Sequence, residues 1–277
     1  MNINIRGKLF DLSKPKVMGI LNVTPDSFHD GGVHNELKNI ENHVNKMVED
    51  GMDILDIGGY SSKPGAKDIS VDEEMSRVIP ILKHIRKIFT DLVISIDTFR
   101  SKIASMSLDE GADIINDISS GTLDKNMISV IAKKNCPYIL MHMQGNPQNM
   151  QNDPSYENVT LEIIQYLAQR IKIARDNNIV DLIVDPGFGF GKKPEHNFEI
   201  LNNLEKFNIL DIPILAGFSR KSMIYKTLKT SSKKALNGTT SLNTIALTKG
   251  AKILRVHDVK EAKECIILHE KTINSLF

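Results

Sequence analysis

The sequence contains no tryptophan and only two cysteines among its 277 residues. Cys136 and Cys265 show neither a CxxC spacing nor the paired framework of a small secreted domain. The start of the chain, from Met1 to Arg6, lacks the apolar core of a signal peptide, and no apolar run approaches the roughly 20 residues that span a bilayer. We therefore expect a cytoplasmic protein without a membrane partner.

An excess of charge of either sign is also absent, because 35 Lys and Arg residues face 34 Asp and Glu residues, for a formal net charge of +1. Both signs are interspersed, whereas nucleic-acid binders need a basic surface to neutralise phosphates. No linker rich in Pro, Gly or Ser and no low-complexity tract divides the sequence. These observations predict small-molecule substrates, no nucleic-acid partner, and a single domain over residues 1–277.

After a predicted β-hairpin from Asn2 to Leu12, short apolar runs alternate with segments of helical spacing such as Glu36 to Asp50, Asp72 to Phe89 and Tyr156 to Asn178. The eight runs are Val17 to Leu21, Ile54 to Ile57, Leu92 to Ile96, Asp113 to Ile115, Tyr138 to Met141, Leu182 to Val184, Ile212 to Leu215 and Lys252 to Val256. They are apolar on both faces, as are parallel strands covered by helices. The pattern predicts an α/β fold, a (β/α)8 TIM barrel whose bottom is closed by the N-terminal hairpin.

An open, doubly wound nucleotide-binding sheet is the alternative arrangement of such units. It would carry a G-x-G-x-x-G sequence after the first strand, and the segment from Leu21 to Asp26 has none. The even distribution of polar residues at the ends of the runs also favours closure into a barrel. The sequence therefore favours the closed barrel over the open sheet.

In a barrel the C-terminal ends of the strands face the catalytic mouth, so the residue that ends each run is informative. Nearly all are polar: Asn22, Asp56, Asp97, Asn116, His142 with Gln144, Asp185, Ser219 to Lys221, and Arg255 with His257. A single acidic residue in such a place is usually a cap or a turn former. Thr98 could cap the following helix and leave the Asp97 carboxylate free, whereas Asp113 looks structural.

The strand ends suggest a site for a flat heterocycle. Two carboxylates (Asp97 and Asp185), an amide (Asn116) and a lysine (Lys221) would match a pterin or a purine, which has donor and acceptor edges. A metal centre is the other reading of paired carboxylates. No His, Asp or Glu group has the spacing of a dedicated transition-metal site, so a zinc enzyme is disfavoured.

Basic residues form a second group beyond the strand ends: Lys63, Arg220, Lys221, Arg255 and His257. Arginine forks and helix N-termini suit phosphate, so this group predicts an anion site, with solvated surface cations as the alternative. Two polar loops, Asn22 to Gly32 with Phe28 and Gly58 to Asp68, could serve as lids that exclude water, or could be disordered without function.

Several motifs match one family. They are MGILNVTPDSF at 18–28, DIGG at 56–59, SIDT at 95–98, IND at 115–117, VDPGFGF at 184–190, SRKS at 219–222 and RVH at 255–257. On these motifs the chain resembles the dihydropteroate synthases along almost its whole length. The resemblance implies condensation of p-aminobenzoate with 6-hydroxymethyl-7,8-dihydropterin diphosphate in folate biosynthesis, assisted by Mg²⁺. It also implies a homodimer and sulfonamides as inhibitors.

The resemblance assigns roles by matched position. The implied pterin-binding residues are Asp97, Asn116, Asp185, Lys221, Met141, Phe190, Gly217 and Arg255. The implied p-aminobenzoate-binding residues are Ser62, Pro64, Phe28, Phe190 and Ser222. Diphosphate would contact Asn22, Lys63, Arg255 and His257, and Asn22 would also bind Mg²⁺. The catalytic residues would be Asp97, Lys221, Asn22, Phe28 and Lys63. Diphosphate would leave first, and the amine would then attack a cation-like pterin methylene.

One position departs from the family. Lys63 stands where these enzymes usually carry arginine, and lysine keeps the charge but loses the bidentate fork. We expect activity to survive this change. Two alternatives stay open: a pterin-dependent methyltransferase, which would need no diphosphate site, and a non-catalytic pterin-binding barrel.

Overall fold

The computed structural model of the chain describes residues 1–23, 33–61 and 68–275. Its main sheet consists of eight strands in the order β8-β7-β6-β5-β4-β3-β10-β9, and all paired neighbours run parallel. The strands are β3 (Lys16–Asn22), β4 (Ile54–Gly58), β5 (Val93–Asp97), β6 (Ile114–Asp117), β7 (Tyr138–Met141), β8 (Leu182–Asp185), β9 (Leu215–Ala216) and β10 (Ile253–Val256). A single bridge, between Val184 and Ile214, joins the two ends of the sheet. The predicted barrel is therefore confirmed, nearly closed.

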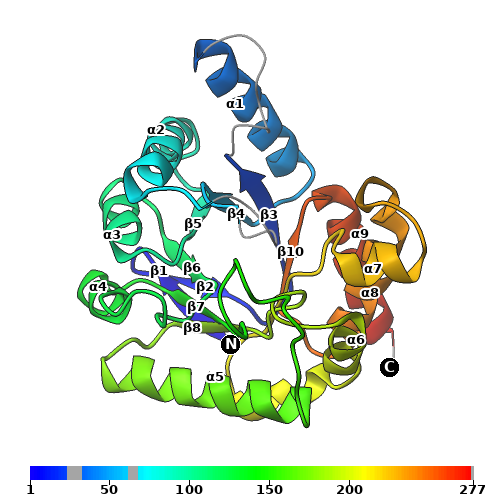
Figure 1. Cartoon of the computed structure of the whole chain (residues 1–277). Coiled ribbons are helices and arrows are strands. Elements are labelled where there is room, and N and C mark those ends of the chain that lie inside the picture. Colours follow the sequence, from blue (N-terminus) through cyan, green and yellow to red (C-terminus); the bar gives the residue numbers. More distant parts are fainter. Residues whose placement is uncertain (24–32, 62–67, 276–277) are drawn as a thin grey trace.

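Helices form an outer layer around the strands (Figure 1). They are α1 (Val33–Glu49), α2 (Val71–Ile88), α3 (Ser101–Asp109), α4 (Met127–Lys134), α5 (Val159–Asp176), α6 (Pro194–Asn202), α7 (Ser222–Thr227), α8 (Leu236–Thr248) and α9 (Val259–Asn274), with 3₁₀ turns at Leu204–Leu210 and Ser232–Lys234. The three helices predicted by residue range correspond to α1, α2 and α5, with ends shifted by a few residues. Side-chain caps define two of these starts, since Ser70 accepts from the Glu73 N–H and Asn158 from the Leu161 N–H.

The seventh barrel strand differs from its prediction. Instead of Ile212 to Leu215, the ladder comprises only Leu215–Ala216, which pairs with β10. Pro213 has no N–H to donate, so the chain beside β8 contributes only the Pro213 carbonyl, which accepts from Val184, and the Ile214 bridge. The apolar run lies where it was expected, but the proline shortens the regular strand.

The N-terminal hairpin closes the bottom of the barrel, as predicted. Strands β1 (Asn2–Ile5) and β2 (Lys8–Asp11) pair antiparallel around Arg6 and Gly7, whose positive φ angles of 51° and 76° suit a tight hairpin turn. Three buried hairpin-region side chains, Ile3, Ile5 and Leu12, pack against a layer inside the barrel. That layer consists of Met18, Ile54, Val93, Ile114, Ile139, Ile183, Leu215 and Ile253.

Alternation along each strand separates this inner layer from the larger core between sheet and helices. In β4, for example, Leu55 and Ile57 belong to the outer core, while Ile54 belongs to the inner layer. Because side chains alternate with a period of two, Asp56 lies on the same side of the strand as Ile54, one step nearer the C-terminal end. The barrel interior is therefore apolar below and polar above.

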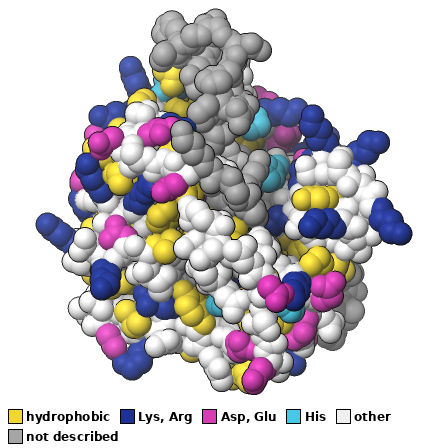
Figure 2. Space-filling model, viewed as in Figure 1, with side chains coloured by type: hydrophobic (Ala, Val, Ile, Leu, Met, Phe, Trp, Pro, Cys, Tyr) yellow, Lys and Arg dark blue, Asp and Glu magenta, His cyan; other side chains and the backbone are white. Residues whose placement is uncertain are grey.

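The surface carries both signs of charge. On the face shown in Figure 2, Lys and Arg side chains are interspersed with Asp and Glu side chains. Among the helices of the described ranges, none combines the length and apolar character needed to cross a bilayer.

Candidate active site

The upper layer of the barrel interior gathers the polar strand ends. Asn116 follows Ile114, Asp185 follows Ile183 and Arg255 follows Ile253, in each case two residues after a member of the apolar inner layer. The same alternation brings in Asp56, Met141 and, four residues after Val93, Asp97. The side chains that were predicted to share the barrel mouth thus come from adjacent strands on one side of the sheet.

A charged triad occupies one side of this layer. The Arg255 guanidinium donates through Nε to Asp56 Oδ2 and through Nη2 to Asp97 Oδ2, each at 2.6 Å. Asn116 donates to the same Asp56 oxygen at 3.1 Å. The other oxygen of Asp56 is buried and has no hydrogen-bond partner in the described part of the chain. Strands β4, β5, β6 and β10 are therefore tied together by their polar ends.

One cation serves two carboxylates in this triad, which leaves one negative charge unmatched. Burial raises the pKa of Asp97 to about 7, Arg255 opposes that rise, and the neighbouring Asp56 adds to it. The pKa of Arg255 lies above its usual range, because Asp56 and Asp97 outweigh the cost of burial. Asp97 is accordingly poised to accept a proton, a ring N–H or a developing positive charge from a bound molecule.

A lysine and a second carboxylate lie across the barrel from the triad. Asp185 Oδ1 accepts from the Gly187 N–H at 2.7 Å. Lys221 Nζ donates to the Phe188 carbonyl at 2.6 Å and lies 4.5 Å from the centre of the Phe190 ring. Burial raises the pKa of Asp185 against the effect of Lys221, and burial lowers the pKa of Lys221 to about 8 against the effect of Asp185. The two pKa shifts have opposite signs, and each favours the uncharged form of its group.

The turn after β8 requires glycine where it meets the neighbouring loop. Gly187 has a φ of +72°, and a Cβ there would lie 1.9 Å from the His142 carbonyl oxygen. No L side chain fits this contact. The close approach brings the turn that follows Asp185 against the segment that follows β7.

Apolar groups and a second glycine complete the upper layer. Met141 is buried in a cluster against which Phe190 packs. Gly217, after β9, has ordinary space for a Cβ, which would lie 3.6 Å from Asp185 Oδ2. The missing side chain at Gly217 leaves the Asp185 carboxylate uncovered on that side.

The predicted basic group is smaller than the sequence suggested. Arg220 donates to both carboxylate oxygens of Asp258, at 2.8 and 2.7 Å, and to the carbonyls of Ser232 and Lys233. Its inclusion in an anion site was wrong, because its donors are committed to the protein. His257 contacts Ser219 Oγ through Nδ1 at 3.1 Å.

His257, which the sequence placed in the basic group, has a lowered pKa. Burial and then the Arg255 charge lower the pKa of His257 to about 4, so the imidazole is neutral at neutral pH. A neutral imidazole can still donate one N–H to an anion.

The expected role of Thr98 holds only in part. Its hydroxyl oxygen accepts from the Arg100 N–H at 3.2 Å, just before α3, and its hydroxyl donates to Glu74 at 2.7 Å. The Ser101 N–H, at the first residue of α3, is bound by Asp124. The Asp97 carboxylate is not free, since Arg255 occupies one of its oxygens. Asp113 is structural, as predicted: it accepts from Arg86 and from the Ile94 N–H.

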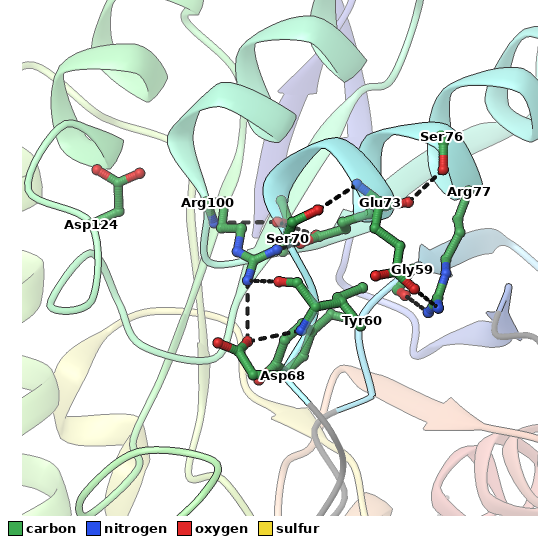
Figure 3. Close-up of polar contacts among 12 residues, drawn as sticks. Gly59, Tyr60, Asp68, Ser70, Glu73, Ser76, Arg77, Arg100 and Asp124 are labelled. Carbon is green, nitrogen blue, oxygen red and sulfur yellow. Dashed lines mark hydrogen bonds and ion pairs between the residues drawn. The ribbon is translucent and has the colours of Figure 1, made fainter.

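Arg100 links the segments on both sides of residues 62–67, as Figure 3 shows. It donates to Glu74 Oε2 at 2.9 Å, to Asp68 Oδ1 at 3.3 Å and to the Ile69 carbonyl. Its guanidinium also lies 5.3 Å from the centre of the Tyr60 ring. Phe28, Ser62, Lys63 and Pro64, and with them most of both predicted lids, lie outside the described residues.

Four buried charged residues were given no role from the sequence: Asp56, Glu74, Asp117 and Lys192. The position of Asp56 on the inner side of β4 was the one available signal. Glu74 lies on α2, and only the folded chain brings it beside Thr98 and Arg100. Lys192 looks like an ordinary surface lysine in the sequence.

The only predicted metal ligand is Asn22, an amide oxygen at the exposed end of β3. A Cβ on Gly58 would lie 3.8 Å from Asn22 Oδ1, so glycine there leaves this oxygen uncovered on that side. Within the described residues, no group of three His, Cys, Asp or Glu side chains could hold a metal. This donor set fits a hard cation that binds mainly through substrate phosphate, and it does not fit a resident metal centre.

Comparisons with known proteins show which family shares this sequence and fold. A family model described as pterin binding enzyme matches residues 18–257. The dihydropteroate synthase of Escherichia coli (strain K12) is 43% identical over 99% of this chain and 98% of its own. A Yersinia pestis dihydropteroate synthase structure with a sulfonamide drug superposes with a TM-score of 0.93 at 40% identity, covering 99% of this chain and 100% of that one. A Xanthomonas albilineans structure with 4-aminobenzoic acid gives a TM-score of 0.91 at 35% identity, covering 100% and 99%.

Proposed function

The chain belongs to the dihydropteroate synthase family of pterin-binding enzymes, which act in folate biosynthesis, and from this premise we propose its reaction and its site. The proposed reaction joins p-aminobenzoate to 6-hydroxymethyl-7,8-dihydropterin diphosphate and yields 7,8-dihydropteroate and diphosphate. The observation that carries the proposal is the polar layer above an apolar barrel interior, formed by the buried Asn116 and Asp185 and the half-buried Asp97 and Lys221.

The pterin would lie against this layer. The Asp97 and Asp185 carboxylates would accept from its ring N–H and amino groups, while Asn116 and Lys221 would donate to its ring nitrogens and carbonyl. Met141, Phe190 and Arg255 would contact the faces of the ring, and Gly217 would leave room beside Asp185. The packing of Phe190 against the Met141 cluster and the uncovered Asp185 oxygen support this placement.

The diphosphate would bind through Asn22, Lys63, Arg255 and His257. Arg255 has its Nε and Nη2 bonded to carboxylates, so Nη1 would be its contact with the anion. His257 would act as a neutral N–H donor, in keeping with its lowered pKa of about 4. The diphosphate would therefore bind to Nη1 of Arg255, to the ammonium of Lys63 and to the uncharged donors of Asn22 and His257.

The p-aminobenzoate would bind between Phe190, the start of α7 and the two loops. Ser222 is the first residue of α7 and would donate its N–H and hydroxyl to the carboxylate of the substrate. Phe28, Ser62 and Pro64 would cover the aromatic ring. Because Phe190 also contacts the Lys221 ammonium, the two substrates would meet at this ring.

The reaction requires no protein nucleophile. The C–O bond of the pterin methylene breaks with its electron pair leaving on diphosphate, and the positive charge spreads into the ring. The p-aminobenzoate nitrogen then donates its lone pair to the methylene, a C–N bond forms, and the nitrogen loses a proton to solvent. The unmatched negative charge of the Asp56, Arg255 and Asp97 triad would stabilise the cationic ring.

We propose that Mg²⁺ enters with the diphosphate and is held on the protein by Asn22. When bound, it would supply charge neutralisation of the departing diphosphate. The donor set described above supports this mode, since it offers an uncovered hard oxygen and no cage.

A diphosphate-release assay tests the proposed function. We expect release that requires p-aminobenzoate, rises with added Mg²⁺ and is inhibited by sulfonamides. Diphosphate retained in every condition would refute the synthase and favour a non-catalytic barrel. Methyl transfer from a methylated folate, without diphosphate release, would favour the methyltransferase.

We also propose a homodimer formed through helices late in the barrel. Three apolar side chains of α8 and α9, Ile245, Ile267 and Leu268, are exposed in the single chain, which supports an interface there. Light scattering should give twice the chain mass of 31.0 kDa. A monomeric mass at the assay concentration would contradict the proposal.

A further inference from the structure

Lys192 is a buried lysine that the proposed reaction does not use. It follows the glycine-rich turn after β8 and is only 3% exposed. Its ammonium contacts four groups: His142 Nδ1 at 3.0 Å and the carbonyls of His142, Gly187 and Phe190 at 3.2, 2.9 and 2.9 Å. Within the described residues, no carboxylate forms an ion pair with it. A buried lysine with acceptors on all sides and no paired charge needs an explanation.

The turn directs its carbonyls toward two different lysines. Gly187 and Phe190 point their oxygens at Lys192, whereas Phe188 points its oxygen at Lys221. The Phe190 N–H also donates to the Gly187 carbonyl. The conformation that places the Phe190 ring 4.5 Å from the Lys221 ammonium is therefore the conformation that satisfies Lys192.

The contacts of Lys192 fit an ammonium group. Burial, then the Lys192 charge, lowers the pKa of His142 to about 2, so the imidazole is neutral and its Nδ1 can accept from the ammonium. Burial holds the pKa of Lys192 well below its usual range, while Asp185 opposes that change and Lys221 adds to it. Four acceptors at hydrogen-bond distance favour the ammonium over the neutral amine.

We infer that Lys192 is a positioning residue for the proposed pterin site, because its buried ammonium fixes the turn from Gly187 to Phe190 and thereby the partners of Lys221. The inference rests on the proposed function and deepens it. Lys192 does not touch substrate. It acts through the Phe188 carbonyl and the Phe190 ring, which set where Lys221 and the aromatic contact lie.

The test compares two adjacent lysines. Lys192→Met keeps an unbranched stem as long as that of lysine but removes the ammonium and its donors from the turn. Lys193→Met is the matched control, because Lys193 is exposed and its ammonium pairs with Asp153 at the surface. We expect Lys192→Met to lower kcat/KM for the pterin diphosphate by about 10- to 100-fold, as small displacements of binding groups do. Lys193→Met should stay within about twofold of the wild type.

Two further readouts separate positioning from general destabilisation. The first is the Kd of 6-hydroxymethylpterin, measured by fluorescence, which should rise in Lys192→Met and remain unchanged in Lys193→Met. The second is the pH profile of kcat/KM. Asp185 is faced by Lys221, the Gly187 N–H, Arg255 and Lys192, and these groups all favour its carboxylate. Loss of Lys192 would raise the pKa of Asp185 further, so the contribution of Asp185 to the acid limb, beside that of Asp97, would move to higher pH.

Unchanged pterin Kd and kcat/KM in folded Lys192→Met would overturn the inference, as would an equal loss in Lys193→Met. If Lys192→Met does not fold, Lys192→Gln, which keeps N–H donors but loses the charge, is measured against the same control. We expect the same loss of pterin binding, and a wild-type Kd would overturn the inference. Wild-type protein that releases no diphosphate would instead refute the proposed function, whatever the lysine variants do.

Discussion

The two ends of the barrel interior differ although the same strands build both. At the N-terminal end, each strand contributes an apolar side chain, and Ile3, Ile5 and Leu12 from the hairpin region cover that layer. At the C-terminal end, two or four residues further along, the same side of the sheet carries buried carboxylates, an amide and an arginine. The lower layer is a packed core, and the upper layer holds charges that the protein itself does not fully neutralise.

This contrast indicates a division between stability and binding. Apolar side chains removed from water stabilise the fold in proportion to the buried area. Buried charges contribute little to stability even when paired, and an unmatched one is unfavourable. The upper layer would therefore be expected to carry apolar residues if folding were its only purpose. Substitutions in the lower layer should therefore change mainly stability, and those in the upper layer mainly activity.

The largest effect on activity should come from Asp97→Ala. Removing this carboxylate takes away a pterin acceptor and the unmatched charge, so we expect kcat/KM to fall by about 10³-fold or more. Arg255 keeps Asp56 as its partner, so the free energy of unfolding should change by less than about 1 kcal/mol. Steady-state kinetics and urea unfolding of the same preparation measure both. A folded Asp97→Ala variant with near-wild-type turnover would contradict the site, as would the same result for Asp185→Ala.

The opposite pattern is expected at the other end of the barrel. Ile183→Ala removes a fully buried side chain from the apolar layer and should lower the free energy of unfolding by about 2–5 kcal/mol. The folded fraction should keep its kcat/KM, because Ile183 lies one step below Asp185 and contacts no proposed substrate group. Ile209→Ala is the control, since Ile209 is 79% exposed and its loss should matter little. Similar stability of the two variants would argue against the role of the lower layer.

Two glycines near the upper layer are expected to differ, because one leaves space for a ligand and the other is required by the fold. Gly217→Ala adds a methyl group at ordinary contact distance from Asp185, so we expect the fold to persist while kcat/KM for the pterin diphosphate falls by about tenfold. Gly187→Ala should reduce stability as well, because its Cβ would overlap the His142 carbonyl and its φ is positive. Thermal unfolding and kinetics of both variants distinguish the cases. Equal stability losses would show that Gly217 is also a structural requirement.

The pH dependence of activity should reflect the upper layer alone. Protonation of Asp97, whose raised pKa is about 7, removes the unmatched charge, so kcat/KM should fall as the pH drops below that value. Deprotonation of Lys221, whose lowered pKa is about 8, removes a donor to the pterin, so kcat/KM should fall as the pH rises above it. A narrow optimum between these values is expected. Lys221→Arg should extend the alkaline limb of the profile, because a guanidinium keeps its proton. If the alkaline limb does not move in this variant, the limb reports the titration of another group.

The smallest effect concerns Lys63. We expect the wild type to be active, and Lys63→Arg to change the KM for the pterin diphosphate and the sulfonamide inhibition constant only a few-fold, because the charge is kept. Undetectable wild-type activity that the arginine restores would show that the bidentate fork is required. Lys67→Arg in the same loop controls for the general effect of an added guanidinium.

Much of this architecture was predictable from the sequence. Apolar runs bounded by polar residues located the strands, because period-two alternation and buried parallel pairing follow from local sequence. Asp97, Asn116 and Asp185 were identified because each ends such a run. The failure at the seventh strand also has a local cause, since Pro213 interrupts the hydrogen-bond ladder.

The remaining features depend on contacts between distant parts of the chain. Arg220 looked available for an anion because Asp258 lies 38 residues away in sequence. His257 looked cationic because its burial is a property of the folded barrel. Lys192 gave no signal, since only folding brings the His142 segment and the turn after β8 together around its ammonium.

The closure of the barrel has a consequence for how the chain folds. Strand β3 pairs with β4 on one side and with β10 on the other, and Ile3 shares its apolar layer with Ile253. During synthesis, one edge of β3 and the apolar side of the hairpin must therefore wait for one of the last segments to be made. Such non-local pairing slows folding, and an unpaired edge invites association with other chains. We expect nascent chains that stop short of β10 to depend on chaperones, whereas chains that include β10 can close the barrel without them.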